Sequence, residues 1–135
     1  MKKYVLACMV LLTVLCFVCG ATGANAPKVD VLYMNHPPMQ PTIKQLKETL
    51  SRYGSKVNVS WHDLDTADGK QFMAAKGLQE HVPLIIWIDG SYSVTLPQGP
   101  VKFTGFPVGS GPPPFQGKWT LKDLETALNQ AITRK

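Results

Sequence analysis

The apolar residues of this chain fall into short segments whose spacing predicts strands and helices in alternation. Residues 29–34 form a β-branched and aromatic run that predicts a first strand. Residues 56–62 alternate strictly, with Val57, Val59 and Trp61 on one face and polar side chains on the other. This alternation is typical of a half-buried strand.

Three more strand candidates lie in the second half of the chain. Residues 82–88 are almost uniformly apolar, the pattern of a strand that is buried on both faces. The pair Asp89-Gly90 that follows is a strong turn signal, and residues 92–96 and 101–106 are further candidates. Residues 107–117 are rich in proline and glycine, so we expect an exposed loop there.

Helical spacing of apolar residues predicts three helices. The first covers residues 40–53. The second has Asp65 or Thr66 as its N-cap and ends at Gly77. The third follows Thr120, its predicted N-cap. Its apolar stripe consists of Leu121, Leu124, Leu128 and Ile132.

The predicted elements follow the order β-α-β-α-β-β-α, which is an α/β arrangement. Parallel strands that are joined by helices require right-handed crossovers, and these place helices on both faces of one sheet. The doubly buried run of residues 82–88 agrees with a strand that is covered from both sides. The sequence therefore predicts one α/β domain with a central β-sheet and helices on both faces.

Residues 1–26 have the layout of a secretory signal peptide, since two lysines precede an apolar run and a series of small residues. One alternative is a permanent membrane anchor, but the apolar run over residues 4–18 is shorter than the ~20 residues of a membrane span. Another is a lipoprotein acylated at Cys19, although the residues before Cys19 fit a lipobox poorly. We therefore expect an exported protein, periplasmic or extracellular, without a permanent membrane anchor.

All three cysteines, Cys8, Cys16 and Cys19, lie in this N-terminal segment, so the exported domain of residues 27–135 is expected to be cysteine-free. That domain must be stable without disulfides, although exported compartments are oxidising. Its formal net charge is +3, against +5 for the whole chain, because two lysines leave with the signal peptide. The basic residues are scattered without interleaved aromatic residues, which gives no support to nucleic-acid binding.

A turn after the first predicted strand carries a family resemblance. His36-Pro37-Pro38-Met39 stands between that strand and the first predicted helix. In this position it resembles the active-site turn of the thioredoxin superfamily, Trp-Cys-Gly-Pro-Cys. His36 and Met39 take the two cysteine positions, and Pro38 takes the position of the family proline.

Other positions extend the resemblance over residues 28–135 and imply a thioredoxin-like fold, with a central mixed β-sheet and helices on both faces. The resemblance implies a buried aspartate at Asp30, a cis-proline at Pro83 after Val82, and a glycine, Gly105, at the end of the last strand. The chain departs from the family in its missing cysteines and in an extended loop region over residues 91–117.

The missing cysteines change the function that the resemblance implies. Dithiol exchange requires a thiolate, so we expect no oxidoreductase activity. Family members pair the backbone beside the proline with an extended peptide, a form of β-augmentation that needs no cysteine. We therefore expect a peptide or protein partner that is held across residues 36–39, Val82-Pro83, Gly105 and the 106–117 loop, where Phe106 and Phe115 can form a lip.

A second interpretation of the turn is a soft-metal site. Met34, His36 and Met39 are close in sequence, and the resemblance would bring His81 near them. Thioether and imidazole ligands suit Cu(I), so copper binding or delivery is the alternative function. Met34 and Met39 can equally be packed core residues. A third, weaker option is a cysteine-free enzyme, for which no residue set is evident.

His62 and Asp63 are the remaining candidates for acid–base chemistry. No nucleophile or third group stands at a recognisable spacing from them. We therefore predict a surface or capped histidine at His62.

Overall fold

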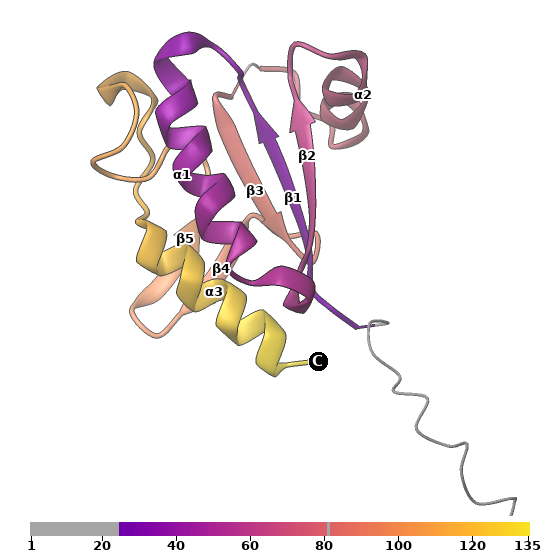
Figure 1. Cartoon of the computed structure of the whole chain (residues 1–135), viewed down its shortest axis with the longest axis vertical. Helices are drawn as coiled ribbons and strands as arrows, with labels where there is room; N and C mark the ends of the chain where they lie inside the picture. The colour runs from indigo at the N-terminus through magenta and orange to yellow at the C-terminus, as the bar shows by residue number, and fades with distance from the viewer. Residues whose placement is uncertain (1–24, 81) are drawn as a thin grey trace, which may run out of the picture.

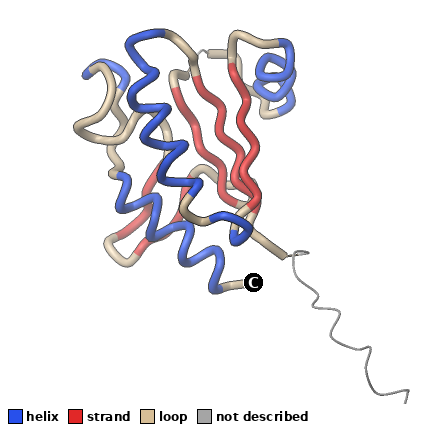
Figure 2. Tube along the Cα trace, in the orientation of Figure 1, coloured by secondary structure: helices blue, strands red, loops and turns tan. Residues whose placement is uncertain are grey.

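The computed structural model describes residues 25–80 and 82–135, so His81 and nearly all of the predicted signal peptide lie outside the described residues. The described chain forms a layered α/β structure (Figure 1; Figure 2). Its strands are β1 (Lys28–Tyr33), β2 (Asn58–Asp63), β3 (Leu84–Ile88), β4 (Ser93–Leu96) and β5 (Gly99–Lys102). Its α-helices are α1 (Gln40–Ser51), α2 (Ala67–Ala75) and α3 (Leu121–Thr133). Short 3₁₀ helices are η1 (Pro37–Met39), η2 (Gly54–Lys56) and η3 (Pro113–Phe115).

Three strands form the main sheet in the order β2-β1-β3. Strand β1 runs parallel to β2 and antiparallel to β3, so the sheet is mixed, as predicted. Val31 of β1 lies opposite Trp61 of β2 and Ile86 of β3. β1 takes the central place because both of its faces are shielded: no residue from Val29 to Tyr33 is more than 7% exposed.

Helices cover both faces of this sheet, which confirms that part of the prediction. On one face, β1 packs against α1 and α3, and Leu46 and Leu128 are fully buried there. On the other face, Leu32 and Trp87 form a smaller apolar cluster, against which Phe72 of α2 packs. In Figure 1, α1 and α3 lie across the sheet and α2 lies beside β2.

Strands β4 and β5 form a separate two-stranded hairpin, which corrects the predicted order. Three strands stand between α2 and α3, in line with the three strand candidates of that region, whereas the predicted order β-α-β-α-β-β-α places only two there. Leu96 pairs with Gly99, so the hairpin turns at Pro97-Gln98. Pro100 stands opposite Thr95 in this two-stranded hairpin, and a proline is tolerated there because both strands of such a hairpin are edge strands.

The predicted strand over residues 101–106 is only partly regular. Its middle, which we call the 103–105 segment, runs along β3 as an extension of the sheet. The Ile86 N–H donates to the Phe103 carbonyl (3.0 Å), and the Gly105 N–H donates to the Leu84 carbonyl (2.8 Å). Phe103 is fully buried, so burial of its ring holds this segment against the sheet.

The expected cis-proline is wrong, because no cis peptide bond occurs in the described residues and Val82-Pro83 is therefore trans. The Pro83 carbonyl accepts a hydrogen bond from the Met34 N–H (3.0 Å), so the chain already follows the ladder between β1 and β3 at this point. An extended entry into Leu84 needs no tight turn. The ordinary trans preference of about 0.5–1 kcal/mol is therefore not overridden.

Helix α3 begins as the sequence predicts. Thr120 and Asp123 form a reciprocal capping box in which each side chain accepts from the other's backbone N–H. The fully buried Trp119 before it donates its indole N–H to the Gly105 carbonyl (3.0 Å). The start of α3 is thereby tied to the 103–105 segment. No helix within residues 25–80 and 82–135 is long and apolar enough to cross a bilayer.

Candidate functional site

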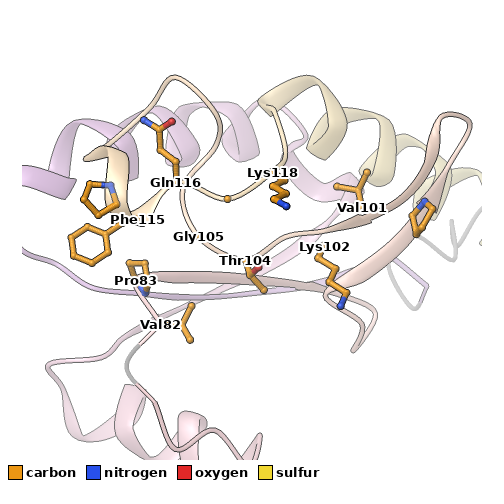
Figure 3. A pocket seen from close by; sticks show the side chains of 12 residues that line it. Val82, Pro83, Val101, Lys102, Thr104, Gly105, Phe115, Gln116 and Lys118 are labelled. Carbon is orange, nitrogen blue, oxygen red and sulfur yellow. The ribbon is translucent and has the colours of Figure 1, made fainter.

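A groove of about 580 Å³ lies between the start of β3, the 103–105 segment and the loop that leads to α3. Val82 and Pro83 line it from the β3 side, Gly105 lies in its middle, and Phe115 lines it from the loop. Figure 3 shows these residues around one hollow. The structure thus brings together three of the four parts of the predicted binding surface.

Two glycines allow the loop to approach the sheet closely enough to form a wall of the groove. Gly105 has φ +72°, and a Cβ there would lie 2.8 Å from the Phe115 carbonyl oxygen. A Cβ at Gly117 would overlap the Thr104 carbonyl oxygen. Since any side chain would collide with backbone at both positions, glycine is the residue that fits them.

The 106–117 loop is held in place at both of its edges. Phe106 is fully buried, its N–H donates to the Phe115 carbonyl (2.8 Å), and its carbonyl accepts from the Gly117 N–H (2.7 Å). Within the loop, the Gln116 side chain bonds to the Gly109 N–H (3.2 Å) and to the Gly111 carbonyl (3.0 Å). The Phe115 ring remains 41% exposed beside the groove. The predicted lip is therefore only half right, because Phe115 lies at the groove whereas Phe106 is buried beneath the loop and does not line it.

The 103–105 segment offers an unused backbone donor to the groove. Its hydrogen bonds to β3 run through Phe103 and Gly105, so the N–H and carbonyl of Thr104 face away from β3. The Thr104 carbonyl accepts from the Trp119 indole (3.3 Å). The Thr104 N–H has no partner within the described residues. An extended chain lying in the groove can therefore accept a hydrogen bond from Thr104.

The two ends of the groove differ in chemistry. Pro83 and Phe115 lie at one end, and the side chains of Lys102 and Lys118 lie toward the other, where Val101 also lines the groove (Figure 3). Among the described residues, none that lines the groove is acidic. The two lysines were not among the residues that sequence analysis singled out, because their meeting depends on the close approach of the loop to the sheet.

The His36–Met39 turn does not line this groove. Met39 is 4% exposed and belongs to the main core, whereas the His36 side chain is 47% exposed and lies with Nε2 3.3 Å from Asp65 Oδ2. Pro37 lines a different hollow, which it shares with α1. The fourth part of the predicted binding surface is therefore separate from the other three.

The predicted soft-metal residues lie in different surroundings. The Met39 sulfur lies among core side chains, Met34 is half-buried against both apolar clusters, and His81 is outside the described residues. No group of three or more His, Cys, Asp and Glu side chains is placed to hold a metal ion in the part of the chain that the structure describes. The burial of Met39 does not favour the copper interpretation.

A polar cluster around His62 lies on the α2 side of the sheet. The sequence analysis named His62 and Asp30 separately but did not predict that they meet. His62 is 14% exposed; its Nδ1 lies 2.8 Å from Asp68 Oδ2 and its Nε2 3.4 Å from Asp30 Oδ1. Its ring stacks on Phe72 at 3.7 Å. Asp30 is 2% exposed, as the resemblance implies, and also pairs with Lys28 (3.4 Å). The signal in the sequence was the shared face of Asp30 and His62 on paired strands.

Comparison with known proteins adds no assignment. When the chain is compared with protein-family models, curated proteins and solved structures, none of them matches it significantly. The function must therefore be argued from the groove and the fold.

Proposed function

We propose that this chain is an exported, thioredoxin-like protein whose domain binds an extended peptide or a segment of a partner protein in the groove. The observation that carries the proposal is the convergence of Val82-Pro83, Gly105 and the 106–117 loop on one hollow. These are the positions at which the family resemblance implies peptide contacts. Their convergence needs no cysteine.

The arrangement of the elements supports the thioredoxin-like part of the proposal. A β-α-β unit with parallel β1 and β2 is followed by an antiparallel β3 and by the 103–105 segment along its free edge. Helices α1 and α3 pack on one face and α2 on the other. Asp30 is buried in the first strand, as in many members of that superfamily.

The groove can hold an extended chain by two kinds of contact. The Thr104 N–H donates to a peptide carbonyl, which is the main-chain contact of β-augmentation. Pro83 and the exposed ring of Phe115 receive an apolar side chain. Because the Pro83 carbonyl is already bonded to Met34, the main-chain contact is assigned to Thr104 and not to the proline.

The proposal includes the absence of dithiol exchange. The turn carries His36 and Met39 at the two cysteine positions, and neither an imidazole nor a thioether can attack a disulfide and exchange with it. The processed protein should leave the rate of insulin reduction by dithiothreitol at the buffer rate. Acceleration by the processed protein would contradict this part.

The binding part is tested by selection from a random peptide display library with the purified protein. We expect enriched peptides whose binding weakens in Phe115→Ala and is unchanged in Val108→Ala. Val108 is the matched control because it is a 57% exposed apolar residue of the same loop that does not line the groove. Failure to enrich any peptide, or equal effects of the two substitutions, would contradict the proposal.

A further inference from the structure

Lys102 and Lys118 form a basic end of the groove that is not neutralised by the protein itself (Figure 3). Both side chains are exposed, and neither makes an ion pair in the described part of the chain. Lys28, Lys44 and Lys135 each lie within pairing distance of a carboxylate, whereas Lys102 and Lys118, like Lys70 and Lys122, do not within the described residues. The positive charge at this end of the groove is therefore available to a ligand.

The backbone of the sheet extension directs this charge into the groove. Phe103 is fully buried, so its neighbours Lys102 and Thr104 point to the opposite side, where both line the groove. Lys118 reaches the same hollow from the connection between the loop and α3. A peptide that lies along Thr104 presents every second side chain to this surface, at intervals of roughly 7 Å.

We propose that the occupant of the groove is an extended segment of a partner protein that carries an acidic side chain at the end facing Lys102 and Lys118. The same segment places an apolar or aromatic side chain against Pro83 and Phe115 at the opposite end. This inference rests on the proposed function and adds the chemical class of the ligand. The carboxylate belongs to an internal glutamate or aspartate of the segment.

The charge pattern favours an acidic peptide over a nucleic acid. Binding of a nucleic acid is carried by several phosphate contacts at once, whereas this groove has two lysines at one end and an apolar opposite end. Two like charges that line one hollow also repel each other, and a bound carboxylate relieves that repulsion. A groove with a cationic end and an apolar end suits an extended segment that carries an acidic side chain and, further along, an apolar one.

The test is a parallel display selection with the wild-type protein and with the double variant Lys102→Gln/Lys118→Gln. The library consists of random peptides that are amidated or fused at both ends, so that only side-chain carboxylates are present. We expect wild-type selections to enrich an acidic position at a fixed offset from an apolar one. The double variant should keep the apolar position and lose the acidic one.

The affinity of one enriched peptide then measures how much its acidic side chain contributes to binding. Replacing its acidic residue with the isosteric amide should weaken binding to the wild-type protein about threefold to tenfold, the range for one or two exposed ion pairs. The difference in affinity between the acidic peptide and its amide form should vanish in the double variant. It should shrink at about 1 M salt, where the Debye length is only about 3 Å. The charge-matched control Lys70→Gln/Lys122→Gln removes two lysines outside the groove and should preserve the difference.

The possible outcomes separate the two proposals. Enriched peptides without an acidic preference overturn the inference and leave peptide binding in place. An acidic preference that is lost equally in the control double variant overturns the inference too, since it reports net charge only. Selection of no peptide at all overturns both. Preferential binding of a labelled single-stranded nucleic acid over every enriched peptide would also overturn the inference.

Discussion

Single glycines decide whether the groove can form. The 106–117 loop approaches the 103–105 segment through Gly105 and Gly117, where a Cβ atom would collide with backbone. Backbone cannot move aside as the end of a flexible side chain can, so a side chain at either position must displace the loop. The shape of the groove therefore depends on the absence of two Cβ atoms.

Gly105→Ala should destabilise the protein and weaken peptide binding. Gly109→Ala is its matched control, because Gly109 also has a positive φ (+78°, against +72° at Gly105) but a Cβ added there would meet no atom within 4 Å. We expect the control to cost about 1–2 kcal/mol of backbone strain and Gly105→Ala to cost a further ~1–3 kcal/mol from the collision. Urea unfolding measures both. Equal values for the two variants would contradict the close approach.

A second residue-scale prediction concerns Tyr33 at alkaline pH. Burial raises the pKa of the Tyr33 phenol, and the negative charge of Asp63 raises it further. The folded state therefore prefers the protonated phenol. The resulting stability is fully present below the unfolded-state pKa of about 10 and is lost as the pH rises through the higher folded-state value.

Tyr33→Phe should therefore flatten the fall of unfolding free energy between roughly pH 9 and 11. Tyr92→Phe, at an exposed tyrosine, is the control and should keep the wild-type profile. Urea unfolding at several pH values measures the slope. A Tyr33→Phe profile as steep as that of the wild type would show that Tyr33 does not contribute to the alkaline loss of stability.

At the scale of elements, α2 is attached to the sheet mainly through a few side chains. Its N-terminus is capped by Thr66, and Phe72 packs on His62 and lies 5.4 Å from the Trp87 ring. His62 also joins Asp68 of α2 to the buried Asp30 of β1. One histidine thus links this helix to the central strand.

His62→Ala should loosen α2 more than the rest of the fold. It removes the ring that Phe72 stacks on and leaves the buried Asp30 carboxylate without this partner, at a cost of about 1–3 kcal/mol. Amide hydrogen exchange should show faster exchange in α2 than in α1 or α3. Asp68→Ala is the control, since the Asp68 side chain is 71% exposed and its pair is worth about 0–1 kcal/mol. Uniform acceleration across all helices would contradict this account.

The elements that could be predicted are those specified by local pattern. The uniform apolar run of β3, the alternation of β2 and the capping box of α3 each act within a few residues, and each was predicted correctly in kind. The pairing of β4 with β5 was not predicted, because the strand candidates over residues 92–96 and 101–106 leave residues 97–100 outside both, whereas Gly99 and Pro100 belong to β5. Pairing of Leu96 with Gly99 is a choice of register that apolar pattern does not specify.

At the scale of the whole molecule, the site arises from contacts between distant parts of the chain. Val82, Pro83 and Gly105 were predicted because a family resemblance supplied their relation to one another. The basic end of the groove was not predicted, because Lys102 and Lys118 come to line one hollow only when the loop folds back on the 103–105 segment. Two interpretations were left open for Met39, a soft-metal ligand or a core residue, and its 4% exposure within the main apolar cluster favours the core.

The central claim is that an extended peptide lies along the 103–105 segment. The most direct measurement is a titration of the ¹⁵N-labelled protein with an enriched peptide, followed by amide chemical shifts. The account predicts that the largest changes occur at Val82, Thr104, Gly105 and Gly117, with a downfield shift of the Thr104 amide as it gains a hydrogen-bond acceptor. Changes centred on α1 near Lys44, with Thr104 unaffected, would contradict it.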